Sequence, residues 1–486
     1  MEGFEELQRK LAEALALNKP GVGVDHAMIV LPSFSLGESL LSHYANRIPA
    51  LEHRYLLALL LLDRIPSCEM FFLSTVPPGE EILEYYGSLL PPKGRSLMQE
   101  RFRHIEVPDT SPRAVAAKLL DRPDILDEVR RIIGDRPAFI EPWNVTDDEV
   151  KVALHLGVPI NGTDPRLWPL GYKSAGRRLF RDTGVPVPVG REDVRAVDDV
   201  LEAIAEVRAE RPAAPGVVVK LDDSGAGDGN MVIRFEGVTP GTGRGNGAHA
   251  RLESLPEWFL DELRQGGIVE ELIVGERFTS PSVQLDILPT GDVDVLSTHE
   301  QVLGGDTGQV YTGCRFPADP TYAPELARQG LAVGERLARE GALGRFALDF
   351  AVASDRTGRA DVYALEVNLR KGGTTHPYAT LRNLVPGRYD AEKGLWECTS
   401  DASPRWYRST DNLVSDAWLG LPPAKVIQSV AEAGLQFDYR TGSGVVLHML
   451  SALAIDGRLG LTAIGRSPEE AEELYERSAA TVPMPA

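Results

Sequence analysis

The chain has 486 residues, 71 of them acidic and 51 basic, which gives a formal net charge of −20. Hydrophobic residues make up 43% and charged residues 25%, the composition of a globular protein with room for about three domains. Tight binding to phosphate backbones relies on clustered Lys and Arg, so this acidity argues against nucleic acid and anionic membranes as partners.

Features tied to the cellular compartment point to the cytoplasm. The three cysteines, Cys68, Cys314 and Cys398, are far apart, which predicts neither a disulfide framework nor a cysteine zinc site. The N-terminal stretch MEGFEELQRKLAEAL has the pattern of an acidic amphipathic helix rather than a signal peptide. The longest apolar run, LLALLLL between Arg54 and Asp63, is too short to span a bilayer. We therefore expect a cytoplasmic protein without a membrane segment.

Residues 1–160 alternate apolar strands with amphipathic helices. Strands are expected at 27–32, 70–75 and 137–143. Helices are expected at 54–65, from Ser111 as N-cap to 121, and at 146–157, where Thr146 and Glu149 fit a capping box. This alternation predicts an N-terminal parallel α/β domain.

The sequence pattern changes at about residue 161, where a second domain is expected to begin and to run to residue 385. It contains an expected helix at 198–210 and strands at 216–221 and 231–235, and a glycine-rich stretch after Glu236 is expected to form a mobile surface loop. Residues 386–486 form a third segment, expected to pack on the second domain, with a clear helix only at 467–478. The fold class predicted is therefore mixed α/β (α+β).

The first chemical feature is the stretch VVVKLDDSGAGDGNMVI. Lys220 ends a strand, and a glycine loop that contains Ser224, Gly225, Gly227 and Gly229 joins it to the next strand. Glycines let backbone N–H groups approach phosphate oxygens, and a lysine adds positive charge. A dinucleotide fingerprint needs a helix after the loop, and a Walker A loop needs Gly before Lys173-Ser174, where Tyr172 stands. The stretch predicts another kind of phosphate loop, or a merely flexible hairpin.

The second feature is the strand GGIVEELIVGERF. It runs through Glu270, Glu271 and Ile273 to Glu276. Such a strand can offer backbone groups to an adenine edge, with an acid after it for ribose hydroxyls. It could equally be a sheet edge with solvated charges.

The third feature is the hairpin RFALDFAVASDRTGRADVYALEVNLRKGGTTHP. A turn at SDRTGRA places Asp349 nearly opposite Glu366, and the period of two puts Glu366 and Asn368 on one face. Two carboxylates and an amide oxygen are the hard ligands that Mg²⁺ prefers, whereas the alternative is solvated surface charge. Arg370 lies two residues further on and could clamp a carboxylate or stabilise an oxyanion.

Together these features resemble the ATP-grasp superfamily from Gly171 to Pro377. The resemblance implies Lys173 and Lys220 as nucleotide-phosphate lysines, the run Glu270–Ile273 as adenine linker and Glu276 as ribose acid. It implies the Mg²⁺ ligands Asp349, Glu366 and Asn368, and the pattern E-x-N-x-R resembles carboxylate-activating members in which the arginine assists catalysis. One departure affects the ribose acid, since some relatives place it one position later, where Arg277 stands here.

More narrowly, most of the chain resembles the pheganomycin-type peptide ligases. The telling stretches are NLRKGGTTHP, THEQVLGGDTGQVYTGCRFPAD, NVTDDEVKVALHLGVPINGTDPRLWPLGYKSAGRRLF, RSTDNL and TGSGVVLHML. The resemblance implies an ATP- and Mg²⁺-dependent ligase of peptide natural-product biosynthesis that forms an acyl phosphate and releases ADP. The implied donor is a small, unusual amino-acid carboxylate bearing a guanidino group, and the implied acceptor is the amine of a peptide or amino acid.

Further polar residues could hold the carboxylate or accept the amine proton, or could be packed or surface residues: His299, Glu300, Arg315 and His376. An ATP-grasp kinase and a non-catalytic nucleotide-binding protein are the alternative functions. A kinase for polyphosphorylated substrates would favour a basic cleft, and a binding-only relative would lack some of the metal ligands. A chain of this size with apolar N-terminal strands could also form a homodimer.

Overall fold

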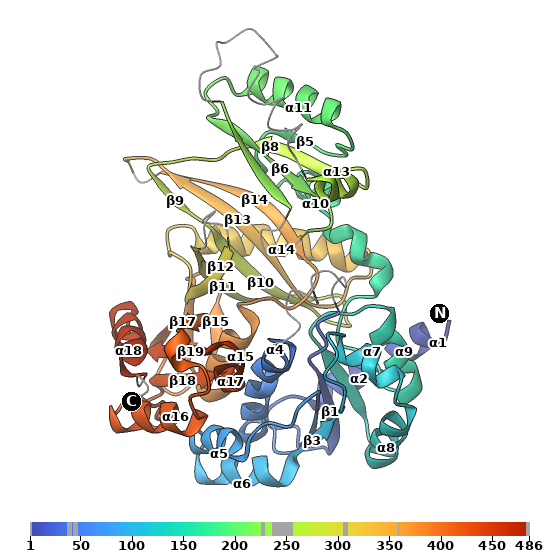
Figure 1. Ribbon diagram of the computed structural model, residues 1–486, viewed down its shortest axis with the longest axis vertical. Helices are drawn as coiled ribbons and strands as arrows, with labels where there is room; N and C mark the ends of the chain where they lie inside the picture. The colour runs from blue at the N-terminus through green and yellow to red at the C-terminus, as the bar shows by residue number, and fades with distance from the viewer. Residues whose placement is uncertain are drawn as a thin grey trace.

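The computed structural model describes residues 2–35, 41, 47–224, 229–235, 256–304, 310–357 and 359–482. A long twisted sheet crosses the middle of the molecule (Figure 1). A small sheet with its helices lies at one end, and the N-terminal unit and the C-terminal helices lie side by side at the other (Figure 1).

The N-terminal unit is a parallel α/β layer, as its sequence predicts. Its strands have the order β3-β2-β1-β4 and are all parallel: β1 (His26–Leu31), β2 (Cys68–Ser74), β3 (Phe102–Glu106) and β4 (Ala138–Pro142). The helical segments are α1 (Glu2–Gln8), α2 (Leu11–Leu17), α4 (Ile48–His53), the 3₁₀ helix η2 (Arg54–Asp63), α5 (Glu80–Ser88), α6 (Pro92–Arg101), α7 (Val115–Leu120), α8 (Pro123–Ile133) and α9 (Asp147–Leu156). Strands β1 and β2 are buried along their whole length, because helices cover both faces of a parallel sheet.

Helix boundaries in this unit follow local hydrogen bonding. The capping box predicted for α9 is confirmed, since Thr146 and Glu149 exchange side-chain and backbone hydrogen bonds. The expected start of α7 at Ser111 is wrong. The Ser111 N–H donates to Asp109 Oδ1 at 2.8 Å in an Asx turn, and the helix begins at Val115.

The small sheet is antiparallel, with the order β5-β8-β6-β7. Its strands are β5 (Gly190–Arg191), β6 (Gly216–Leu221), β7 (Asn230–Arg234) and β8 (Gly267–Glu271). The helical segments around it are η3 (Pro165–Gly171), α10 (Lys173–Asp182), α11 (Val197–Glu210) and α13 (Glu257–Leu263). The glycine-rich stretch that was expected to form a mobile loop lies outside the described residues.

The large sheet runs β14-β13-β10-β11-β12-β17-β16-β15, with β9 paired to β13, β19 to β17 and β18 to β19. Its first strands are β9 (Arg277–Thr279), β10 (Pro281–Ile287), β11 (Val293–Gly304), β12 (Val310–Phe316), β13 (Gly344–Ser354) and β14 (Ala360–Asn368). Helix α14 (Ala323–Arg339) packs on β10 and β11.

The C-terminal strands continue this sheet by hydrogen bonding, because β12 pairs with β17. They are β15 (Gly387–Asp390), β16 (Leu395–Cys398), β17 (Pro404–Val414), β18 (Gly444–His448) and β19 (Arg458–Gly465). The helical segments are α15 (Thr375–Leu384), η4 (Asp416–Trp418), α16 (Pro423–Glu432), η5 (Leu450–Ala452), α17 (Leu453–Asp456) and α18 (Pro468–Thr481).

The N-terminal and C-terminal parts share one hydrophobic core. Helix α15 lies against η2, and the backbone N–H of Leu447 donates to the hydroxyl of Tyr85 at 2.8 Å. This core fixes the C-terminal strands relative to the N-terminal sheet. Within the described ranges, no helix is both long and apolar enough to cross a membrane.

The buried carboxyl group of Glu52 makes stability depend on pH. It accepts hydrogen bonds from the N–H and the hydroxyl of Thr75 at 2.7 and 2.8 Å, but burial raises its pKa from 4.5 to about 7. Because the pKa in the folded state is the higher one, this contribution to stability is complete below pH 4.5 and is lost as the pH rises through 7. In urea unfolding between pH 5 and pH 8, Glu52→Gln should lose less stability with rising pH than the wild type. Equal slopes would contradict this account.

Candidate active site

A cluster of oxygen ligands lies on the hairpin of β13 and β14. The register places Asp349 opposite Glu366 and Ala347 opposite Asn368, one residue away from the count of the predicted turn because the register shifts between Asp349 and Phe350. Asn368 Nδ2 donates to Asp349 Oδ2 at 2.9 Å, and Gln301 Nε2 on β11 donates to Asp349 Oδ1 at 2.7 Å. The three predicted metal ligands therefore lie together, and Gln301 is a fourth member that sequence reasoning missed.

The electrostatics of this cluster fit a divalent cation. Burial and the neighbouring Glu366 carboxylate raise the pKa of Asp349 to about 7. Two carboxylates this close repel each other, and a cation between them would remove that repulsion. Carboxylate and amide oxygens are the donors of magnesium sites, so Asp349, Glu366 and Asn368 could hold Mg²⁺.

Lys173 links this cluster to the glycine loop. It is the first residue of α10, and its Nζ lies 2.7 Å from the carbonyl oxygen of Ser224 and 3.4 Å from Glu366 Oε1. Asp222 anchors the loop, since its carboxylate accepts from the N–H of Ser174 at 2.8 Å. Ser224 thus contacts Lys173 beside the cluster and Gly229 lies next to Ser224, whereas Gly225 and Gly227 lie outside the described residues.

The ammonium group of Lys220 is paired with a carboxylate of the small sheet. It forms an ion pair with Glu270 on the adjacent strand β8, and Arg177 Nη1 binds the other oxygen of Glu270 at 3.0 Å. Arg177 and Glu270 are almost completely buried, and Arg177 Nε also binds Glu192 at 2.8 Å. Glu270 therefore holds Lys220 in place on the small sheet.

The expected adenine linker, Glu270–Ile273, starts on the last two residues of β8 and continues beyond the strand. Strand β8 ends at Glu271, and residues 272–276, including the half-buried Ile273, have no regular structure. Glu271 Oε1 accepts from the N–H of Val189 at 2.8 Å. Glu276 is half-exposed and forms an ion pair with Arg356 in the β13–β14 turn. The linker thus crosses from the small sheet to the large one.

Arg370 stands two residues after the end of β14 and lies near the carboxylates of Glu366 and Asp349. Its guanidinium stacks on the ring of Trp143, 5.0 Å from the ring centroid. Burial lowers its pKa, an effect that Glu366 and Asp349 oppose, and an arginine keeps its charge under these conditions. A fixed positive charge next to the metal ligands can stabilise a developing oxyanion.

The remaining predicted catalytic residues do not gather at this cluster. Arg315 extends from β12 to Glu472 on α18, at 2.9 Å, and is half-exposed. Glu300 accepts from the hydroxyl of Tyr322 and from the Asp319 N–H at 3.2 Å, and burial raises its pKa. His299 Nε2 lies 2.6 Å from the Tyr407 hydroxyl, and burial lowers its pKa to about 3.

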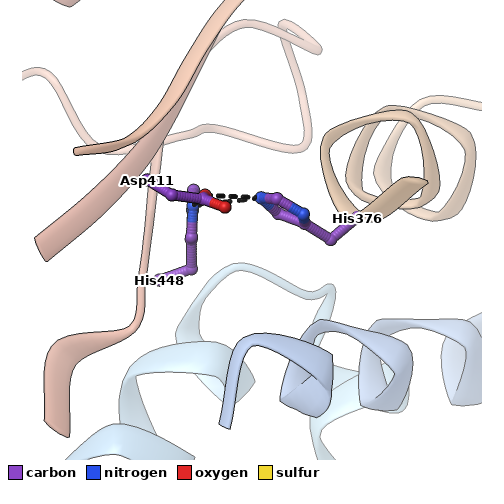
Figure 2. Close-up of side chains that lie close together, drawn as sticks. All are labelled: His376, Asp411 and His448. Atoms are coloured by element: carbon purple, nitrogen blue, oxygen red, sulfur yellow. Dashed lines mark hydrogen bonds and ion pairs between the residues drawn. The ribbon is translucent and has the colours of Figure 1, made fainter. Parts of the chain in front are cut away.

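His376 belongs to a second cluster that the sequence did not reveal. Its Nε2 lies 2.8 Å from Asp411 Oδ1, and His448 Nε2 lies 2.7 Å from the same oxygen (Figure 2). Arg54 Nη1 binds Asp411 Oδ2 at 2.7 Å. Burial lowers the pKa of His376 to about 4, so its ring is neutral at pH 7. Asp411 and both histidines have the donor types of a transition-metal site.

One of the site residues that the sequence analysis missed, Arg177, could have been found from its spacing in the sequence. Arg177 stands four residues after Lys173, the spacing that puts both on one helix face. The cluster around Asp411 has no such signal, because its members come from α4–η2, α15, β17 and β18.

Family models match two parts of the chain. Residues 249–390 match the model described as "IQCH-like, ATP-grasp", and residues 425–478 match the model described as "PGM1 C-terminal domain". The first range contains the hairpin cluster and Arg370, and the second contains His448.

Similar proteins include an enzyme and a longer animal protein. L-propargylglycine–L-glutamate ligase from Streptantibioticus cattleyicolor is 34% identical over 379 residues, 76% of this chain and 76% of the relative. IQ motif-containing protein H from Danio rerio is 24% identical over 360 residues, 63% of this chain but 34% of the relative, so the chain spans about a third of that protein.

Solved structures share the fold at low identity. The biotin carboxylase–β,γ-ATP complex from Campylobacter jejuni superimposes with a TM-score of 0.57 at 12% identity, over 94% of this chain and 92% of the other. This likeness concerns the fold alone.

Two arginines that bind the same carboxylate provide a test of the buried ion pairs. Arg177 is 1% exposed and Arg181 is 46% exposed, and both bind Glu192. Arg177→Met should lower the free energy of unfolding by about 3–5 kcal/mol, because Glu270 loses a buried partner. Arg181→Met should change it by about 1 kcal/mol or less. Urea unfolding measures both, and equal losses would show that Arg177 is not the anchor of Glu270.

Proposed function

The chain belongs to the ATP-grasp ligases. From this membership we propose that it joins the carboxylate of a small amino acid to the amine of another amino acid or a peptide. The proposed reaction passes through an acyl phosphate and releases ADP. The observation that carries the proposal is the hairpin cluster. It brings Asp349, Glu366 and Asn368 together beside the cations of Lys173 and Arg370.

The residues of the cluster would have different roles in phosphoryl transfer. Such a transfer depends mainly on positioning and charge stabilisation, which this set of residues can supply. Lys173 and Lys220 would bind the phosphates of ATP, and the loop from Ser224 to Gly229 would cover them. When bound by Asp349, Glu366 and Asn368, Mg²⁺ would neutralise phosphate charge.

The proposed reaction has two steps. A carboxylate oxygen of the donor attacks the γ-phosphorus, the bond to the β-phosphate oxygen breaks, and ADP leaves. The acceptor amine then attacks the acyl carbon, loses a proton and expels phosphate. Arg370 would stabilise the negative charge on the oxygens in both steps.

The nature of the substrates rests on the relatives and on the surroundings of the cluster. The ligase from Streptantibioticus cattleyicolor joins two amino acids by name, which supports an amino acid on each side of the new bond. We extend this to an unusual, guanidino-bearing donor and a role in peptide natural-product biosynthesis, on the resemblance to pheganomycin-type ligases. Of the catalytic residues suggested by sequence, Arg370 lies nearest to this chemistry, whereas Arg315 is paired with Glu472.

Hydroxylamine trapping tests the proposed reaction. With Mg-ATP and hydroxylamine as a general amine, a panel should contain propargylglycine, ordinary amino acids and guanidino-bearing amino acids. We expect ADP and a hydroxamate to appear together for at least one donor, because hydroxylamine captures an acyl phosphate. Formation of AMP and pyrophosphate would refute the phosphoryl route, and phosphorylated donor without hydroxamate would favour a kinase.

Substitution of a metal ligand tests the assignment of the cluster. Asp349→Asn should weaken the binding of MgADP at least about 100-fold, since it removes a charged ligand. The matched control is Asp361→Asn on β14, whose carboxylate is 58% exposed and lies 3.9 Å from Arg359. Isothermal titration with and without Mg²⁺ measures both variants. If both bind MgADP like the wild type, the cation site lies elsewhere.

A further inference from the structure

The segment that carries Arg370 is a strap that leads from the end of β14 into the first turn of α15, here defined as residues 370–376. At its first end, the N–H of Lys371 donates to the Trp143 carbonyl at 3.2 Å, and Lys371 Nζ lies 2.6 Å from Glu141 Oε1. Both partners belong to the N-terminal unit. This end of the strap is therefore tied to the edge strand β4 and the loop after it.

The middle of the strap is held by the large sheet. Thr375 Oγ1 donates to Gln284 Oε1 on β10 at 2.8 Å and accepts from the N–H of Gly372 at 3.1 Å. A Cβ atom at Gly373 would lie 2.5 Å from the ring of Tyr311, so the tyrosine packs directly on the backbone there. A side chain at this position would push the strap away from β12.

The last residue of the strap, His376, reaches the cluster in Figure 2. Asp411 Oδ1 accepts from the Nε2 atoms of His376 and His448, and Asp411 Oδ2 accepts from Arg54. One carboxylate thus connects the strap, the C-terminal strands β17 and β18, and the N-terminal unit. His448 is fully buried, and a Cβ atom at Gly460 would overlap its ring, so the ring packs directly on the backbone of β19.

The charges of this cluster are balanced without a metal ion. The guanidinium of Arg54 neutralises Asp411, and the neutral ring of His376 can donate its Nε2 proton to the shared oxygen. A divalent cation between these three groups would compete with both N–H donors and would add two positive charges next to Arg54. Buried net charge of this size is costly, so the arrangement favours a hydrogen-bonded network over a metal site.

We propose that Asp411 is a positioning residue for the ligation, which acts through His376 and the strap to hold Arg370 at the reacting carboxylate. This inference rests on the proposed function. A shift of about 1 Å in a charge that stabilises a transition state can lower the rate about 100-fold, although the residue that causes it never contacts the substrate.

Kinetics of Asp411→Asn test this role. The variant should lower kcat for hydroxamate formation about 30- to 100-fold, while KM for ATP and the affinity for MgADP stay within about threefold of the wild type. His448→Gln keeps a donor near the position of Nε2 and should recover most of the rate that His448→Phe loses. The matched control is Thr462→Val, which removes a buried 2.8 Å hydrogen bond to Ser409 in the same sheet. It should leave kcat within about threefold.

A double-mutant cycle separates positioning from general damage. In an Arg370→Ala background no charge remains to be positioned, so Asp411→Asn should lower the residual rate by less than about threefold. A full multiplicative loss would overturn the proposal, and so would equal losses in Asp411→Asn and Thr462→Val. One equivalent of transition metal in the wild-type protein, absent from Asp411→Asn, would also overturn it. If Arg370→Ala keeps full hydroxamate formation, Arg370 is not the group that is positioned and this inference fails, whereas a wild-type protein that forms no hydroxamate would refute the proposed function itself.

Discussion

The constraint on which the site depends is that charged groups withdrawn from water need partners of opposite charge. Asp349 and Glu366 face each other across β13 and β14, and burial, together with the repulsion from Glu366, raises the pKa of Asp349 to about 7. The same rule orders the small sheet, where Glu270 lies between Lys220 and Arg177. Nucleotide phosphates and a divalent cation would enter a region in which Lys173, Lys220 and Glu270 already have partners.

The fold connects the site to all parts of the chain. The large sheet contributes the acidic hairpin, the small sheet contributes Lys220, and α10 contributes Lys173 between them. The C-terminal strands extend the large sheet through β12 and share a core with the N-terminal unit. Consequently the strap with Arg370 is bounded on each side by a different part of the molecule, and its position depends on residues far away in sequence.

The parts of the site that could be predicted from sequence are those fixed by local geometry. Counting residues from the turn puts Asp349 nearly opposite Glu366, and a one-residue register shift between Asp349 and Phe350 then makes them direct partners. The pattern of apolar residues likewise predicts strands β1 and β2, and the capping box predicts the start of helix α9. By contrast, the ion pairs of Arg177 with Glu270 and of Arg54 with Asp411 join residues 93 and 357 positions apart. No local pattern specifies such contacts, because they depend on how whole elements pack.

Transfer of ¹⁸O from the donor carboxylate tests the central claim most directly, once a donor is known. The carboxylate oxygen that attacks the γ-phosphorus becomes part of the phosphate group. It leaves with that phosphate when the amine attacks the acyl carbon. The account therefore predicts one ¹⁸O atom in each molecule of inorganic phosphate formed with the amide product, as measured by mass spectrometry. Label recovered in AMP, or phosphate free of label while amide is formed, would contradict an acyl phosphate at the Asp349–Glu366 cluster.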